Sequence, residues 1–412
     1  MLSYLLLRLA QQLVETLLAV QNRRHVVDPE RLGIAARALG VADDEMEKAV
    51  AYSADRYRFG LVSGWIEVIA TLAFLAAGGL GLVESWARAT AASVGLGAIP
   101  VGLTFFAILG LASGLLALPF DLYSTFRIEQ KHGFNRQTLR GFLLDRVKGL
   151  ALGMALGGPL LAALLFVMAR MGPTWWLWAW GLVAGFNLLA AWIYPSLLAP
   201  IFNRFTPLSP GELREEIQAL ARRVGFRMRG IFVMDASRRT AHGNAYFTGL
   251  FGQKRIVLFD TLLTATAPRE VVAVLAHELG HFKLHHVRSA ILRSVALSGV
   301  LFFTLSLLLP LAPFYAAFSL SRSPQGALVV SGLWFGLASF LLQPLENGIS
   351  RAHELAADRF ALRAGATPAE LSGALLKLRE QSRLLPHAHP FYSRVYHSHP
   401  PLLERLRAMG AL

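Results

Sequence analysis

The chain has 412 residues, of which 54% are hydrophobic and only 16% are charged, and its formal net charge is +14. A soluble domain usually carries about 25% charged residues, so this composition predicts an integral membrane protein. The Lys and Arg residues fall between apolar segments, as membrane topology signals do, which argues against a nucleic-acid partner. Because the chain has no cysteine, disulfides, thiolate metal ligands and cysteine nucleophiles are excluded.

Seven segments are candidates for membrane-spanning helices, each of which needs about 20 mostly apolar residues. The first segment, residues 1–20, contains Arg8 and Glu15 and lacks a small-residue cleavage site. We therefore expect a retained, somewhat polar helix rather than a cleaved signal peptide. The other six segments are residues 60–84, 98–121, 149–171, 174–199, 287–313 and 326–346.

The connections between these segments alternate in charge. Residues 85–97, 170–174 and 314–325 carry one arginine each, whereas Lys and Arg crowd residues 21–59, 122–148 and 200–286 and the tail after residue 347. The positive-inside rule places the basic regions in the cytoplasm, with the N-terminus outside and the C-terminus inside. Richness in Ala, Leu, Gly and Arg indicates a bacterial source, so we expect the bacterial inner membrane rather than the endoplasmic reticulum.

The segment between the fifth and sixth apolar runs has the pattern of a folded domain. Residues 208–225 predict an amphipathic helix opened by Ser209 and Pro210. The stretches GIFVMDAS, NAYFTGL and KRIVLFDTLL are short and rich in β-branched and aromatic residues, and they predict a small antiparallel sheet. A helix then begins at Pro268 and continues through VVAVLAHELGHFKLHH.

This last helix contains a metal-binding pattern, in which His277, Glu278 and His281 spell His-Glu-x-x-His. The spacing places two imidazoles one turn apart on one face, where both can bind a single ion, with Glu278 beside them. In a chain without thiolates, a site of histidine and carboxylate favours zinc, and we expect one ion per chain. The alternative is a surface helix with scattered histidines.

A catalytic zinc needs a third protein ligand and one open position. The best candidate is Glu354 in the stretch ENGISRAHELAADRFAL, where Asp358 lies one turn later on the same helical face. Asp358 is placed to fix the tautomer of a ligand imidazole from outside the coordination sphere. His353 is a rival ligand, but it points about 100° away from Glu354 around the helix. We expect His285 and His286 to be polar residues at a helix end.

These residues predict peptide hydrolysis. Zinc lowers the pKa of its bound water towards about 7, and Glu278 is the expected general base that takes the proton as the water attacks a carbonyl. The developing oxyanion also needs a cationic or hydrogen-bonding donor. Arg351, one turn before Glu354, and His397 or His399 in YHSHPP are the candidates, and ordinary surface contacts are the alternative for each.

Several stretches of the sequence match one family together: DLYSTFRIEQKHGFN at residues 121–135, AHGNAYFTGLFGQKRIVLFDTLL, HELGHFKLHH, NGISRAHELAADRFAL and YHSHPPLLERL. From about residue 120 to its end, the chain resembles the type I CAAX prenyl endopeptidases, membrane zinc proteases that process isoprenylated proteins. The resemblance implies seven transmembrane helices around a water-filled chamber, which the zinc domain closes on the cytoplasmic face. It also implies that a strand formed by Asn244, Ala245, Tyr246 and Phe247 pairs with an extended substrate.

We therefore expect a mainly α-helical integral membrane metallopeptidase. Residues 1–199 form a membrane region with five spans, and residues 287–346 contribute two more. Residues 200–286 and 347–412 form the two parts of the cytoplasmic zinc domain, the first with the metal motif and the second with the third ligand. The expected partners are membrane lipid and a peptide or protein substrate, prenylated or not.

Two other functions fit part of the pattern. A quality-control protease similar to the HtpX group shares the metal motif but has fewer membrane spans, so seven spans and NAYFTG favour the CAAX group. A transporter or zinc-regulated channel would carry charges inside its spans. Glu67 and Asp121 instead lie near segment ends, and a structural zinc site has no open position.

Overall fold

The computed structural model describes residues 1–93, 97–248 and 254–412, and it is mainly helical. The helices of the first half are α1 (Leu2–Val26), α2 (Pro29–Leu39), α3 (Asp43–Ala76), α4 (Gly79–Ser93), α5 (Ala98–Tyr123), α6 (Leu139–Arg170), α7 (Trp175–Ile193) and α8 (Ala199–Phe202). Those of the second half are α9 (Glu212–Arg223), α10 (Asp260–Ala265), α11 (Pro268–Lys283), α12 (His286–Leu308), α13 (Ala312–Ala316), α14 (Pro324–Arg363), α15 (Pro368–Ser382), α16 (Pro390–Tyr396) and α17 (Leu402–Ala408). Two π-helical segments, Ser124–Glu129 and Tyr194–Leu198, extend α5 and α7.

Within the described residues, six helical stretches are long and apolar enough to cross a membrane. They are Asp43–Ala76, Ala98–Glu129, Leu139–Arg170, Gly172–Phe202, His286–Leu308 and Pro324–Arg363. Each overlaps one of the six strongly apolar segments predicted above, and three of those segments (60–84, 149–171 and 287–313) extend beyond the end of the helix. The expected first span corresponds to α1, which has 25 residues and does not meet the same hydropathy requirement.

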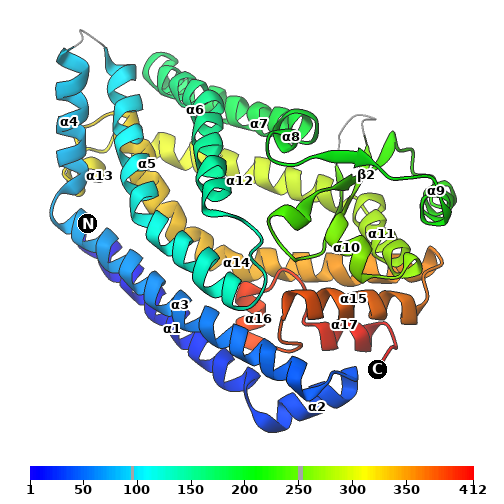
Figure 1. Cartoon of the computed structure of the whole chain (residues 1–412). Helices are drawn as coiled ribbons and strands as arrows, with labels where there is room; N and C mark the ends of the chain where they lie inside the picture. Colours follow the sequence, from blue (N-terminus) through cyan, green and yellow to red (C-terminus); the bar gives the residue numbers. More distant parts are fainter. Residues whose placement is uncertain (94–96, 249–253) are drawn as a thin grey trace.

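The span expected at residues 60–84 is wrong at its C-terminal end. Helix α3 ends at Ala76, and α4 leaves in a different direction from Gly79 (Figure 1). Gly78 has a φ of 71°, a conformation that ends a helix and that residues with a Cβ rarely adopt. The connection expected at residues 85–97 is consequently helical as far as Ser93.

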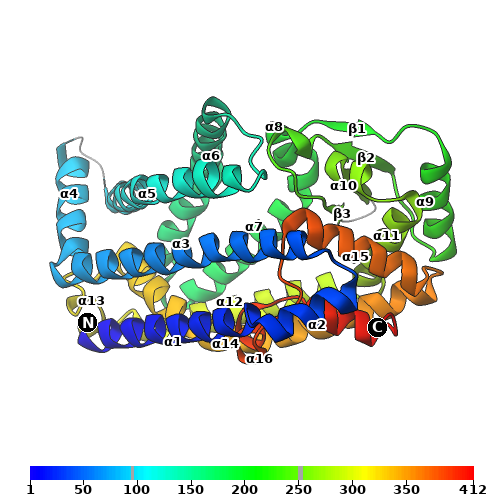
Figure 2. The same ribbon diagram turned by 60° about the horizontal axis from the view of Figure 1, so that its bottom comes forward.

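The helices enclose two main hydrophobic cores. One lies among the membrane helices and includes Phe105, Trp175 and Val330, whereas the other lies between the sheet, α9, α11, α15 and α17. Figures 1 and 2 show α1 and α3 running alongside each other, with α2 connecting them at the end that lies near α17. Ala35 and Leu39 of α2 belong to the second core. The N-terminal segment is thus packed against the metal-motif domain.

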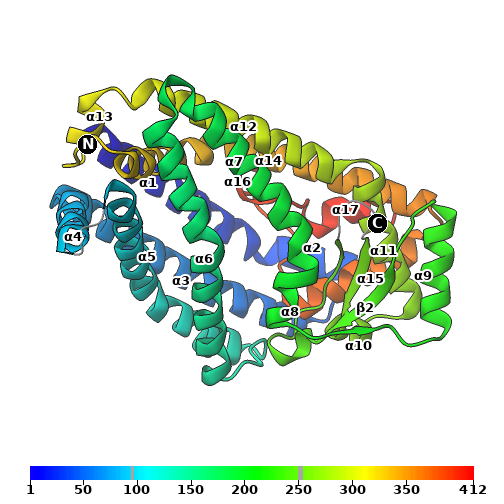
Figure 3. The same cartoon turned by 90° about the horizontal axis from the view of Figure 1, so that it is seen from above.

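Helix α14 joins the two cores, because Val330 belongs to the first and Ala361 to the second. The side chain of Ser323 caps its start by accepting a hydrogen bond from Gly326 N, and Pro324 occupies the first turn. The boundary expected between residues 346 and 347 falls within this continuous helix. Figure 3 shows α12 and α14 running along the same side of the molecule towards α11.

The sheet has four strands, β1 (Phe205–Pro207), β2 (Gly230–Met234), β3 (Ala245–Thr248) and β4 (Arg255–Phe259), in the order β1-β2-β4-β3. The prediction of an antiparallel sheet is wrong for its central pair, because β2 and β4 are parallel, with Gly230 opposite Arg255. The chain leaves β2 through residues 235–244, which pair with residues 134–136 rather than forming a tight hairpin. Strand β3 is therefore placed beyond β4, at the edge of the sheet.

The two helices predicted in this domain, at residues 208–225 and from Pro268, are present as α9 and α11. Helix α9 begins at Glu212 rather than near Ser209, and Gly211 precedes it. At the start of α11, Glu270 Oε2 accepts a hydrogen bond from Ala267 N at 2.7 Å and from Lys377 Nζ of α15 at 2.6 Å. These contacts fix the helix that carries the metal motif against the second core.

Candidate active site

Helices α11 and α14 bring three possible metal ligands together. One ligand atom each from His277, His281 and Glu354 lies within 4.8 Å of the other two. The two imidazole Nε2 atoms are 3.2 Å apart, and the Glu354 carboxylate oxygens lie 3.2 Å from His281 Nε2 and 3.4 Å from His277 Nε2. All three side chains come from α-helices, His281 from the last turn of α11, so hydrogen-bonded backbone supports each of them.

These spacings fit a tetrahedral metal ion. Two ligand atoms held about 2.1 Å from a tetrahedral zinc lie about 3.4 Å from each other. Moreover, Glu354 Oε2 is buried, and no donor among the described residues reaches it with hydrogen-bond geometry, although His399 Nδ1 lies 2.8 Å away. A cation bound by these three side chains would satisfy that oxygen.

His277 is oriented by a buried pair of charged residues. Its Nδ1 lies 2.8 Å from Asp358 Oδ1, and Arg405 donates to both oxygens of Asp358, at 2.6 and 2.9 Å. Burial lowers the pKa of His277, but the hydrogen bond to Asp358 and the nearby carboxylate of Glu354 outweigh this effect and raise the pKa to about 9. The surroundings therefore favour positive charge at the proposed metal position. Arg405 was not expected from the sequence, although it lies in the quoted stretch YHSHPPLLERL.

His281 has a different outer partner. Its Nδ1 lies 3.0 Å from Nδ1 of His286, whose ring stacks on His353 with 3.9 Å between ring centroids. His286 is therefore in contact with the candidate ligand rather than being only a helix-end residue. The backbone turn at His285, which has a φ of 59°, separates α11 from α12 and returns His286 towards His281.

Glu278 lies on the same helix as the two histidines and is partly buried. Burial raises the pKa of its carboxyl group, and the neighbouring His277 and His281 act in the opposite direction. A carboxylate with a raised pKa is a better proton acceptor near neutral pH, which is what a general base requires.

The three candidates for stabilising an oxyanion, Arg351, His397 and His399, differ in their surroundings. The Arg351 guanidinium donates through Nη1 to three backbone carbonyls, at 3.0 Å to Ser393, 3.4 Å to Arg394 and 2.7 Å to His397. Arg351 therefore ties α14 to the end of α16. His399, whose Nδ1 lies beside Glu354, is mostly exposed, and His397 is partly buried. Of these side chains, His399 is the one in contact with a candidate metal ligand.

Of the expected substrate strand, Ala245, Tyr246 and Phe247 lie in β3, and Asn244 directly precedes it. Strand β3 is at the edge of the sheet and packs against α11. Phe259 N donates to Asn244 O, so the backbone groups of Asn244 and Tyr246 point to β4. Those of Ala245 and Phe247 point to the outer edge. The side-chain oxygen of Asn244 accepts from Ala245 N at 2.8 Å. Within the described residues, both backbone groups of Phe247 therefore point away from β4.

Comparisons with known proteins cover both halves of the chain. Residues 29–204 match the family model described as CAAX prenyl protease N-terminal, five membrane helices, and residues 207–412 match Peptidase family M48. The CAAX prenyl protease 1 homolog of Arabidopsis thaliana is 38% identical, over 90% of this chain and 88% of that protein. CAAX prenyl protease 1 of Saccharomyces cerevisiae is also 38% identical, over 74% of this chain and 71% of that protein. The crystal structure of S. mikatae Ste24p superposes with a TM-score of 0.92 and 30% identity, covering 98% of each chain.

Proposed function

Because this chain belongs to the CAAX prenyl proteases of peptidase family M48, a family of membrane metalloproteases, we propose that it is a zinc endopeptidase that cleaves prenylated proteins near their C-terminus. The observation that carries this proposal is the meeting of His277, His281 and Glu354 beside Glu278, at distances that fit one zinc ion. The match to the five-helix N-terminal model favours this function over an HtpX-type protease.

In the proposed mechanism His277, His281 and Glu354 hold the ion. When bound, zinc polarises the substrate carbonyl and makes a water molecule acidic enough to act near neutral pH. Glu278 accepts the proton of that water and passes it to the leaving amine. His399, in contact with the ligand Glu354, is the proposed donor to the oxyanion, whereas Arg351 acts mainly by holding the segment that carries His397 and His399.

Asp358 and Arg405 act outside the coordination sphere. Asp358 accepts the Nδ1 proton of His277, which leaves the Nε2 lone pair facing the metal position. Arg405 balances the charge of Asp358 and fixes its two oxygens. We assign His286 a similar orienting role towards His281.

The substrate binds as an added strand along the outer edge of β3. Backbone recognition suits a protease that must hold an extended chain, and the free groups of Phe247 and the carbonyl of Ala245 would pair with it.

We further propose that α1 is a seventh span and that the seven spans surround a chamber closed by the zinc domain on the cytoplasmic side. Helix α1 packs along α3, and its polar Gln12 is buried rather than facing lipid. In the six apolar helices, only 6–11% of the residues in each most apolar window are buried. A solid helix bundle would bury a much larger share of these residues. The exposure of the inner faces of the helices, in addition to their lipid-facing sides, therefore supports a chamber. The bacterial inner membrane stays a prediction from composition.

The experiment that tests this function offers the purified protein in detergent three substrates: a farnesylated CAAX peptide, its unprenylated twin and an unfolded soluble protein. We expect cleavage next to the prenylated cysteine, faster for the farnesylated peptide, because each buried CH₂ is worth about 0.8 kcal/mol. The Glu278→Gln variant is the control without activity. Equal rates for the two peptides would show that the enzyme does not recognise the prenyl group. Rapid degradation of the soluble protein would favour the function of a quality-control protease.

A further inference from the structure

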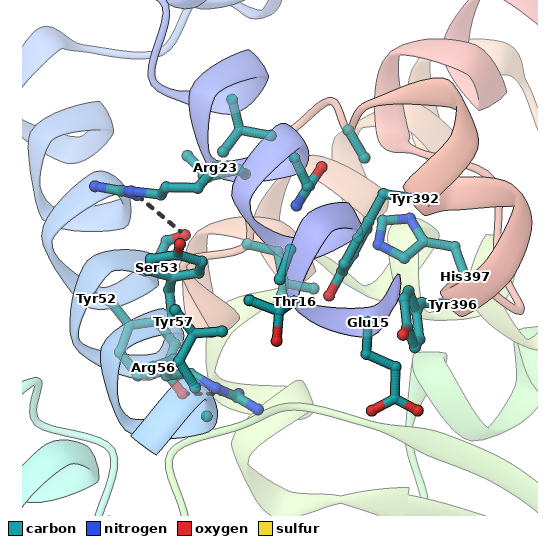
Figure 4. A pocket seen from close by; sticks show the side chains of 18 of the residues that line it. Glu15, Thr16, Arg23, Tyr52, Ser53, Arg56, Tyr57, Tyr392, Tyr396 and His397 are labelled. Carbon is teal, nitrogen blue, oxygen red and sulfur yellow. Dashed lines mark hydrogen bonds between the residues drawn. The ribbon is translucent and has the colours of Figure 1, made fainter. Parts of the chain in front are cut away.

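A cavity of about 550 Å³ lies between α1, α3 and the C-terminal segment 383–397. None of the three proposed metal ligands lines it. Figure 4 shows side chains from α1, from α3 and from the C-terminal helix α16 around this space. The proposed catalytic mechanism does not use the cavity.

The cavity contains a cation, Arg56, that among the described residues is linked to the nearest carboxylate, Glu129, only through the Tyr52 hydroxyl. Arg56 of α3 donates through Nη1 to the Tyr52 hydroxyl at 3.2 Å, and within the described parts of the chain its guanidinium makes no ion pair. Arg23 of α1 reaches only Ser53 Oγ, at 3.5 Å. The carboxylate of Glu15, on the other side of Thr16 from Arg56, accepts a hydrogen bond from Gln11 Nε2 (Figure 4). The α3 side of the cavity is therefore suited to an anion, because a guanidinium binds a carboxylate through two parallel hydrogen bonds.

The wall of the cavity is connected to the proposed metal centre through residues 397–399. His397 lines it, and its carbonyl accepts from Arg351, one turn before Glu354 on α14. His399, two residues further along the chain, contacts Glu354 itself. Two residues span at most about 7 Å, so the backbone at His397 on the cavity wall lies within that distance of the backbone at His399.

A second connection runs from the substrate strand. His242, just before β3, lies 3.8 Å from Glu129, and Glu129 accepts a 2.7 Å hydrogen bond from the Tyr52 hydroxyl at the cavity wall. The N-terminal end of β3 thus points to the Tyr52 side of the cavity. Antiparallel strand pairs are the commoner kind, and a substrate strand antiparallel to β3 runs with its C-terminal end in this direction.

We propose that this cavity binds the C-terminal carboxylate of the peptide substrate, with Arg56 as its main partner. This inference rests on the proposed function. A C-terminal tripeptide beyond the cleaved bond spans about 10 Å when extended, and it leaves the metal towards the cavity. The enzyme therefore recognises a chain end, and the Tyr52 hydroxyl, which accepts from Arg56 and donates to Glu129, holds the guanidinium in place.

The test uses two farnesylated peptides of the same sequence, one with a free C-terminal carboxylate and one with a C-terminal amide. For the wild type, we expect kcat/KM for the acid to exceed that for the amide about tenfold to a hundredfold, as for a hydrogen-bonded charge. Arg56→Gln should abolish this preference by raising KM for the acid, and it should leave kcat/KM for the amide unchanged. Arg56→Lys should recover part of it. Arg58→Gln is the matched control, since Arg58 lies two residues away on α3 and lines a different hollow.

Unchanged turnover of the amide by Arg56→Gln also shows that the variant is folded. Equal cleavage of acid and amide by the wild type would overturn the carboxylate site while leaving the proposed function intact. Retention of the acid preference in Arg56→Gln would overturn the assignment of Arg56. If the wild type cut neither peptide, the proposed function itself would fail and this inference with it.

Discussion

Replacing Asp358 by asparagine should separate metal affinity from protein stability. Asp358 is 1% exposed and accepts hydrogen bonds from His277 and, twice, from Arg405. Asparagine keeps the shape but removes the charge, and its amide group must face either the imidazole or the guanidinium, both of which donate. Loss of such an outer partner usually weakens metal binding about 10–100-fold, or by about 1.4–2.8 kcal/mol.

The same substitution removes the hydrogen-bonded counter-ion of the buried Arg405 and leaves Glu354, 3.7 Å away, as its remaining ion-pair partner. Breaking a fully buried pair costs about 3–5 kcal/mol of stability, and Glu354 should reduce that loss. Zinc affinity is measured by competition with a chelator of known affinity, and stability by thermal unfolding in detergent with the metal removed. We expect both to fall in Asp358→Asn. The double variant Asp358→Asn with Arg405→Leu should recover stability but not zinc affinity.

Glu404→Gln, an exposed neighbour of Arg405, is the control for loss of one negative charge. If Asp358→Asn bound zinc within about threefold of the wild type, well short of the usual loss, Asp358 would not orient His277 and the reasoning would be refuted.

Three further predictions concern catalysis and topology. Glu278→Gln should retain zinc and lose roughly 10²–10⁴-fold in kcat, since it removes the base but no ligand; loss of the metal would contradict this role. His399→Ala should lower kcat about 10²–10³-fold, whereas Arg351→Gln should mainly lower the unfolding temperature because three carbonyls lose their donor; the opposite pattern would exchange their roles. Pro210→Cys in this cysteine-free chain should react with an impermeant thiol reagent only from the cytoplasmic side, and labelling from the other side would refute the orientation.

The metal motif could be predicted from the sequence because its spacing is local. His277 and His281 are one helical turn apart, and Glu354 and Asp358 repeat this spacing on α14, so helical periodicity alone aligns each pair. The apolar helices were equally predictable, since membrane length and hydropathy are properties of single segments. The family resemblance is confirmed by relatives that cover most of the chain.

Features that depend on distant contacts could not be predicted in the same way. The parallel pairing of β2 and β4 follows from the docking of residues 235–244 on a segment about 100 positions earlier in the chain. The ion pair between Arg405 and Asp358 joins residues 47 positions apart, and neither pattern nor charge singles out Arg405 among the basic residues of the tail. The break at Gly78 interrupts an apolar run, and hydropathy does not detect a change of helix direction.

The metal content of the purified protein tests the central claim most directly. Elemental analysis after purification without added metal should find one zinc ion per chain, bound by two histidines and one carboxylate. In Glu354→Ala the zinc should be lost, whereas in His353→Ala it should remain, because His353 stacks on His286 rather than facing the other ligands. Iron or manganese in place of zinc, or full zinc occupancy in Glu354→Ala, would contradict the account.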